Sequence, residues 1–300
     1  MKWLKIWLAI GLVVVGSSRV IAAEGEGFYV IPPFVEAKIE SGREKLSVEI
    51  EIGNKSLQEA TFEISVVDFG SLDETGGLAF ITANSDKNEK KYALASWVTL
   101  EKNSLTVLPG KSEKVKMTIL NRESLSPGGH YGAVLATVKS SDQGVAETVG
   151  INQSLASLIY VLKTGGEVVD LSLNRVEFDK NILKFPETIK LRFWNKGNVH
   201  VVPRGTVVIR NNQGKIVSQG IINGDSGKVL PESFRIMELP LKKLGFWNWP
   251  GKYILEINYR DEGNDKFTTF KTGVVYVGFE GVLMGVGLVG LLALFWRKFA

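Results

Sequence analysis

The chain has 300 residues, of which 44% are hydrophobic, 23% are charged and none is cysteine. The absence of cysteine excludes disulfide bonds, thiol catalysis and lipid attachment through a cysteine. The formal net charge is +4, but five of the 36 basic and one of the 32 acidic residues lie in the two apolar ends, which leaves 31 of each sign between them. Since basic residues never run longer than two in a row, the sequence indicates no nucleic-acid partner.

The first 23 residues have the pattern of a secretory signal peptide. Lys2 and Lys5 precede an apolar run at 7–16, and the small residues Ala22 and Ala23 offer cleavage sites. The alternative is an uncleaved N-terminal anchor. Both interpretations place residues 24–273 outside the cytoplasmic membrane.

Residues 24–164 are predicted to form a first domain made of strands. Apolar side chains alternate with polar ones at Leu46, Val48, Ile50 and Ile52, which is the pattern of a strand with one buried face. The same period predicts strands at 62–66, 115–119, 133–138 and 157–162, with turns at 54–55, 75–77, 109–110 and 127–129. The polar segment 87–95 is predicted to be a loop or a short helical turn.

Residues 165–273 are predicted to form a second domain of the same kind, after a linker at 164–166. Strands are predicted at 168–178, 189–194, 206–210, 215–219, 234–239, 253–259 and 267–272, with hairpin turns at 211–214 and 261–264. Short strands at this spacing, in two sets, predict an all-β fold of two tandem immunoglobulin-like β-sandwiches.

The C-terminal end is predicted to be a transmembrane helix at 274–296, with a cytoplasmic tail at 297–300. Residues 274–295 contain one charge, Glu280. About 20 apolar residues at about 1.5 Å each are enough to cross a hydrocarbon core about 30 Å thick. Arg297 and Lys298 predict that the C-terminus is cytoplasmic, so the chain is expected to be a type I single-pass membrane protein with an extracellular or periplasmic body.

No set of residues predicts catalysis, a cofactor or a metal. A catalytic serine would need a marked turn and a histidine, and no Gly-x-Ser-x-Gly sequence is present. The two histidines, His130 and His200, belong to different predicted domains, which makes a shared metal site improbable. We therefore expect a protein that is not an enzyme and has no cofactor.

Five aromatic or histidine side chains are candidate partner contacts. Phe246, Trp247 and Trp249 lie between glycines in a predicted loop, where they either close the end of a sandwich core or form an exposed anchor. His130 and Tyr131 stand at the entry of a strand after Pro127-Gly128-Gly129. The alternative for His130 is a hydrogen-bonded structural corner.

The order of several short motifs resembles the family of WxL-interacting surface proteins. In the first domain these are residues 28–33 (FYVIPP), 53–56 (GNKS), 67–69 (VDF), 108–110 (LPG) and 126–134 (SPGGHYGAV). In the second they are residues 195–205 (NKGNVHVVPRG), 229–233 (VLPES) and 250–253 (PGKY). The resemblance implies a docking function at the cell wall, through peptidoglycan, partner surface proteins or a host ligand. Similar sandwiches occur in periplasmic pilus chaperones.

Three functions follow as hypotheses. The first is a non-catalytic surface protein that binds or scaffolds cell-wall polysaccharide or partner surface proteins. The second is a membrane-tethered assembly factor that lends a strand to a secreted subunit; it requires an open edge strand and basic residues between the domains, for which Arg192, Lys196 and Arg204 are candidates. The third and least supported is a surface hydrolase, which would need paired carboxylates in a pocket.

Overall fold

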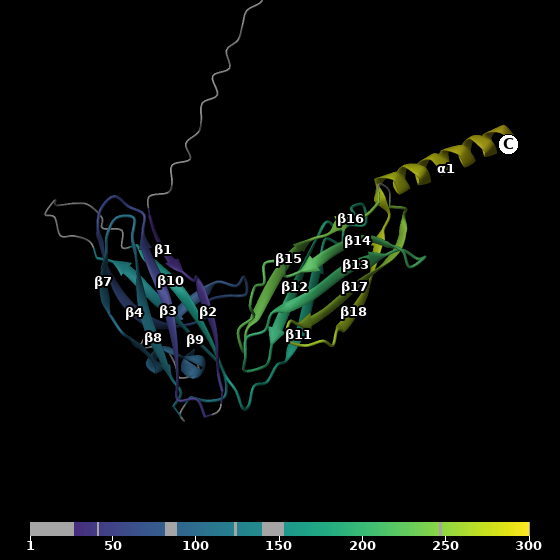
Figure 1. Ribbon diagram of the computed structural model, residues 1–300. Helices are drawn as coiled ribbons and strands as arrows, with labels where there is room; N and C mark the ends of the chain where they lie inside the picture. Colours follow the sequence, from purple (N-terminus) through teal and green to yellow (C-terminus); the bar gives the residue numbers. More distant parts are fainter. Residues whose placement is uncertain are drawn as a thin grey trace, which may run out of the picture.

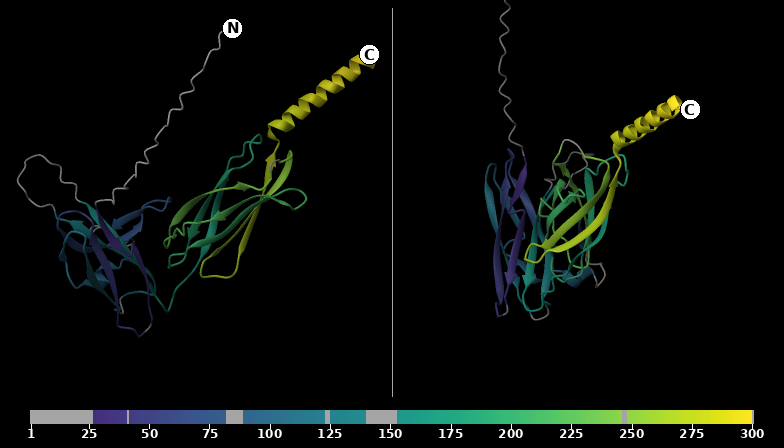
Figure 2. Two further views of the ribbon diagram at one scale, coloured as in Figure 1. Left: turned by 45° about the horizontal axis from the view of Figure 1, so that its top comes forward. Right: turned by 90° about the vertical axis from the view of Figure 1, so that its right-hand side faces the viewer.

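The structure is a computed structural model that describes residues 27–40, 42–81, 89–122, 125–139, 153–245 and 248–299. Within these ranges the chain forms two β-sandwich domains followed by one long helix (Figure 1). The domains meet at one end and diverge from it, and the helix projects from the far end of the second domain (Figure 2). The prediction of an all-β chain with two domains is confirmed, whereas the predicted signal peptide lies outside the described residues.

The first domain consists of two sheets. Its strands are β1 Phe28–Ile31, β2 Phe34–Ile39, β3 Lys45–Asn54, β4 Ala60–Ser71, β5 Leu78–Ile81, β6 Val98–Leu100, β7 Ser104–Val107, β8 Ser112–Leu120, β9 Gly128–Val138 and β10 Ser154–Lys163. Over the described residues one sheet has the order β1-β3-β8-β6, and the other has the order β2-β10-β9-β4-β5 with β7 beside β4. A short 3-10 helix, Glu89–Tyr92, lies in the segment 87–95 that was predicted to be a loop or helical turn, and a second, Ala95–Trp97, begins at the last residue of that segment.

The core of the first domain lies between these sheets and uses the alternation seen in the sequence. Ile50 and Ile52 on β3 are at most 1% exposed, as are Val115, Met117 and Ile119 on β8. They pack against Phe62 and Ile64 of the other sheet. Burial of such side chains stabilises the fold by roughly 1.5–3 kcal/mol each.

The chain changes sheets between β1 and β2. Pro32 and Pro33 separate these strands, and a proline has no backbone N–H with which to continue a ladder. As a result β1 pairs antiparallel with β3 in one sheet, and β2 pairs parallel with β10 in the other. The alternation of apolar residues in the sequence predicts neither of these short strands.

The second domain also consists of two sheets. Its strands are β11 Leu171–Phe178, β12 Thr188–Asn195, β13 Pro203–Arg210, β14 Ile216–Ile222, β15 Phe234–Pro240, β16 Lys242–Lys243, β17 Gly251–Asp261 and β18 Thr268–Tyr276. Among the described strands the sheets are β11-β12-β15 and β16-β14-β13-β17-β18. Strand β11 starts at Leu171, three residues later than predicted, because residues 167–170 belong to the connection between the domains.

Buried asparagines close three loops and give a structural role to two of the resemblance motifs. The Nδ2 of Asn54 donates to the carbonyls of Gln58 and Val107, at 2.7 and 2.9 Å. The Nδ2 of Asn195 donates likewise to Val199 and Val229, at 2.7 and 3.0 Å. The Nδ2 of Asn223, in the connection between β14 and β15, likewise donates to two backbone carbonyls. Loop carbonyls that would otherwise be buried without a donor are thereby satisfied.

The predicted membrane segment divides into the end of a strand and a helix. Val274 and Tyr276 are 6% and 8% exposed and belong to β18, so residues 274–276 are part of the second domain and not of the helix, which corrects the predicted start. Helix α1 runs over Gly278–Phe299. Among the described residues, no helix meets the length and hydropathy required to span a membrane.

Candidate functional site

The two domains meet at an aromatic cluster on the outer face of the β2-β10-β9-β4-β5 sheet. Phe69, Tyr131 and Tyr160 pack edge to face or tilted, with ring centroids 5.4–5.8 Å apart. Leu230 of the second domain is buried against them. His200, also from the second domain, lies 5.2 Å from the Tyr160 ring centroid. This contact explains why β9 is buried without alternation from Gly128 to Val134, since its sheet is covered on both faces there.

Burial keeps the polar groups of this cluster neutral. It lowers the pKa of His200 to about 4; the carboxylate of Glu36 acts against this shift, and the ammonium of Lys228 adds to it. It also raises the pKa of Tyr160 to about 12. The Nδ1 of His200 lies 3.5 Å from the hydroxyl of Tyr131. At neutral pH the side chains of the aromatic cluster itself therefore carry no charge.

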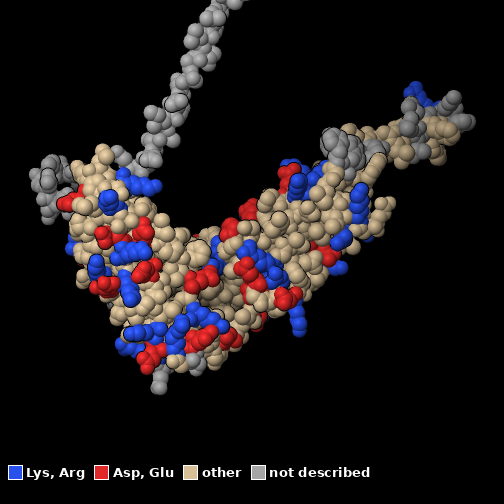
Figure 3. Space-filling view, in the orientation of Figure 1, with Lys and Arg blue, Asp and Glu red and all other residues tan. Residues whose placement is uncertain are grey.

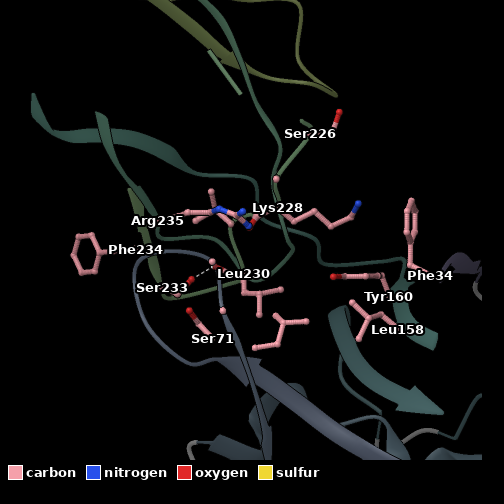
Figure 4. Close-up of a pocket in the computed structure, with 15 residues that line it drawn as sticks. Phe34, Ser71, Leu158, Tyr160, Ser226, Lys228, Leu230, Ser233, Phe234 and Arg235 are labelled. Carbon is pink, nitrogen blue, oxygen red and sulfur yellow. Dashed lines mark hydrogen bonds between the residues drawn. The ribbon is translucent and has the colours of Figure 1, made fainter. Parts of the chain in front are cut away.

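A cavity of about 260 Å³ opens beside the cluster and between the domains (Figure 4). Phe34, Leu158 and Tyr160 form its wall on the first domain, and residues 226–230 and 233–235 form its wall on the second. Two basic side chains, Lys228 and Arg235, line the apolar space. Such a site suits a small anionic group on an otherwise apolar ligand.

Lys228 connects the two walls of this cavity. Its Nζ lies 2.6 Å from a carboxylate oxygen of Glu36, and only 15% of the side chain is exposed. The same ammonium lies 4.8 Å from the Phe34 ring centroid and 5.0 Å from that of Tyr160. Since its charge is already matched by Glu36 and by two aromatic faces, Lys228 mainly holds the cavity together.

Arg235 is the basic group that remains available in the cavity. Its Nη1 donates to the carbonyl of Lys228 at 2.8 Å. Its guanidinium fills the space beside Gly76 and Gly227, where an added Cβ would lie 2.3 Å from Cζ and 2.6 Å from Nη2. Over the residues that the structure describes, no carboxylate lies within 4.0 Å of Arg235. A carboxylate from outside the chain would therefore find a guanidinium without a competing acid.

The start of β10 forms an open sheet edge close to this cavity. Strand β2 pairs with Leu158–Lys163 only, whereas β9 pairs with the whole of β10. The amide of Val138 donates to the carbonyl of Gln153, so the backbone groups of alternate residues, including Leu155 and Ser157, point to β9. Those of Ser154 and Ala156 point to the opposite side, where no described strand pairs with them.

Comparisons with known proteins find similarity at the level of solved structures. No protein-family model and no curated protein matches the chain. A structure of the chaperone–tip adhesin complex of CFA/I fimbriae matches with 15% identity and a TM-score of 0.46, over 83% of this chain and 99% of the other. The class 5 fimbriae chaperone CfaA matches with 16% identity and 0.44, over 83% and 99%. The periplasmic chaperone SfaE matches with 9% identity and 0.38, over 83% and 100%. The resemblance to WxL-interacting proteins stays a prediction.

The three basic residues expected between the domains have other roles. Arg192 binds both carboxylate oxygens of Glu74, at 2.6 and 2.5 Å, and thereby fastens the β4–β5 hairpin of the first domain to the second. Arg204 binds Glu262 at 3.0 Å. The Nζ of Lys196 lies 4.5 Å from the Trp194 ring centroid. None of the three lines the cavity, so Lys228 and Arg235 replace them as the basic groups there.

The predicted contact residues do not form one site. His130 and Tyr131 are 3% and 1% exposed. Both ring nitrogens of His130 face backbone carbonyls, of Ala93 at 3.1 Å and Ser126 at 2.8 Å, which is the arrangement of a hydrogen-bonded corner. Trp249 is 66% exposed at the far end of the second domain, and Phe246 and Trp247 lie outside the described residues.

Sequence reasoning missed the cavity because its residues come from separate segments. Lys228 and Arg235 carry no motif, and Gly76 and Gly227 are separated by 151 positions in the numbering. One signal was present: residues 226–230 (SGKVL) follow a strand and overlap the quoted motif at 229–233. The Pro127-Gly128-Gly129 turn also meets the second domain, since Gly129 donates its amide to the carbonyl of Asn198 at 2.8 Å.

Proposed function

We propose that this chain is a non-catalytic protein-binding module that takes an extended segment of a partner protein as an added β-strand. The observation that carries the proposal is the open edge of β10, where the outward backbone groups of Ser154 and Ala156 lack a partner strand among the described residues. An extended peptide gains main-chain hydrogen bonds by adding to such an edge. The function is that of an assembly factor or docking protein.

The cavity beside this edge favours a particular chemical group at the end of the bound segment. A segment that runs parallel to β10, as β2 does, reaches Phe34 at the start of β2. Phe34 lines the cavity that contains Arg235. A carboxylate at this end of the segment, either a chain terminus or an acidic side chain, would pair with the guanidinium. Phe34, Leu158 and Tyr160 would contact its apolar neighbours.

Attachment to a membrane through α1 is the second part of the proposal. All described side chains from Leu283 to Arg297 are exposed, and they include Leu283, Val286, Leu288, Val289 and Phe295, each 58–66% exposed. A row of exposed apolar side chains such as this, along the described part of the helix, favours a lipid or protein environment. Attachment to a bilayer also suits the expected location of the two domains outside the cytoplasmic membrane.

The edge proposal is tested by site-specific cross-linking. Because the chain has no cysteine, Ser154→Cys can carry a single thiol-linked photocrosslinker at the start of β10. We expect the labelled full chain to form a defined adduct with a protein of its own extracellular fraction. Ser47→Cys, exposed on β3 in the other sheet, is the matched control and should give none.

A proline at Ala156 then separates strand addition from simple proximity. In Ala156→Pro the only backbone hydrogen removed points away from β9. The melting temperature of the domain should therefore fall by no more than a proline on an edge strand usually causes. The adduct at Ser154→Cys should disappear in this background. Equal adduct yields with and without the proline, or at Ser47→Cys, would contradict addition of a strand at β10.

A further inference from the structure

The end of the second domain from which α1 projects combines basic and apolar side chains on one surface. The carbonyl of Ile182 accepts hydrogen bonds from the amides of Val277 and Gly278, at 2.7 and 3.1 Å, so loop 179–187 lies at the base of the helix. The pairs Lys252–Val275 and Gly251–Tyr276 place the start of β17 at the same end. The pair Arg210–Ile254 places the turn 211–215 there too, and we call this surface, made by residues 179–187, 211–215, 242–245, 248–252 and 275–278, the α1 pole.

Exposed lysines give the α1 pole its charge. They are Lys180, Lys184, Lys215, Lys242, Lys243 and Lys252, and the described acidic residues there are Asp179 and Glu187. None of the six ammonium groups lies within 4.0 Å of a described carboxylate. Elsewhere on the face shown in Figure 3, basic and acidic side chains are mixed. The balance at the pole therefore favours a polyanionic partner surface.

Apolar side chains lie among these lysines. Ile182 is 48% exposed, Leu183 43%, Leu244 47%, Trp249 66% and Val275 53%. Large exposed apolar groups interspersed with lysines are the composition of surfaces that lie in a lipid headgroup region, where the apolar groups enter the acyl boundary and the ammonium groups remain at the phosphates. A tryptophan suits the same depth.

We infer that the α1 pole binds an anionic bilayer surface. The inference rests on the proposed membrane attachment through α1, because the helix begins in this surface and would bring it to the headgroups. Lipid phosphates would pair with the lysines, and Ile182, Leu183 and Trp249 would enter the interface. The second domain would then rest on the membrane, with the first domain and its open edge held away from it (Figure 1).

Vesicle experiments with the full chain test this inference. Leu183→Cys, labelled with a polarity-sensitive fluorophore, reports the environment of the pole, and Leu57→Cys in the first domain, where Leu57 is 84% exposed, is the control. In phosphatidylcholine vesicles that contain phosphatidylglycerol we expect a blue shift at position 183 and none at position 57. The shift should be lost in phosphatidylcholine alone or in high salt.

Charge variants and flotation separate the two proposals. Each surface lysine contributes about 1 kcal/mol to binding of anionic lipid, so the triple variant Lys180→Gln, Lys184→Gln, Lys252→Gln should weaken the lipid-dependent shift by about 100-fold in lipid titration. Flotation of the chain with vesicles measures attachment through α1 and should persist in this variant. Flotation without a shift at position 183 would overturn the pole inference alone, and failure to float with either lipid would overturn the membrane attachment itself.

Discussion

At the scale of the residue, His200 is the group whose ionisation most directly links the two domains. It is neutral at pH 7 because burial against Tyr131 and Tyr160 holds its pKa at about 4. The unfolded chain, with a pKa of about 6.5 for this group, binds the proton more readily. Stability is therefore fully present above pH 6.5 and is lost as the pH falls towards 4, by roughly 3 kcal/mol at most.

This linkage predicts the behaviour of a His200→Gln variant. The difference in unfolding free energy between the wild-type chain and the variant should shrink as the pH falls from 7 to 4, because only the wild-type chain must keep an imidazole unprotonated. Chemical denaturation at a series of pH values measures this difference. The contributions of the carboxylates cancel, because both chains contain the same ones. A difference that is independent of pH would show that His200 is solvated.

At the scale of the element, the hairpin between β4 and β5 fastens the domains to each other. Glu74 at its tip binds Arg192 through two hydrogen bonds, and the carbonyl of Glu74 accepts from the amide of Ile236 at 2.6 Å. The guanidinium holds the pKa of Glu74 below its usual range. Arg192 also stacks on Phe234, with Cζ 3.5 Å from the ring centroid. These contacts set the width of the cavity, which Phe234 and Arg235 also line.

Removal of the Glu74 carboxylate should loosen the domain arrangement without unfolding either domain. Spin labels on cysteines introduced at Leu57 and Ile221, which are 84% and 71% exposed, report the distance between the domains. We expect Glu74→Ala to broaden this distance distribution. Glu238→Ala is the matched control, because Glu238 pairs with Lys190 within the second domain. An unchanged distribution in Glu74→Ala would mean that the aromatic cluster alone fixes the arrangement.

At the scale of the whole molecule, strands could be predicted where apolar and polar side chains alternate. Features formed by segments that are far apart in the sequence could not be predicted. Strands such as Lys45–Asn54 and Ser112–Leu120 were predictable because one face is buried and the other solvated. Phe28–Ile31 and Phe34–Ile39 were missed, since each is too short for a period to emerge and two prolines separate them. Residues 274–276 were predicted to belong to the membrane helix, because the buried end of a strand and the start of an apolar helix have the same apolar composition.

The candidate site could not be predicted from the sequence for a related reason. An edge is open or closed according to which strands pair, and the free side of Ser154 and Ala156 follows only from the short pairing of β2 with β10. The cavity likewise depends on the angle between the domains. The sequence predicts only a class of function, a non-catalytic binding protein, and that stays a prediction.

Amide hydrogen exchange along β10 tests the central claim most directly. If the start of β10 is an open edge, the amide of Ala156 should exchange rapidly in the isolated full chain, while those of Leu155 and Ser157, which point to β9, are protected. Addition of the cross-linked partner, or of a peptide taken from its adduct site, should then protect Ala156 as well. Protection of Ala156 in the isolated chain would show that another segment already covers this edge, and the proposed function would fail.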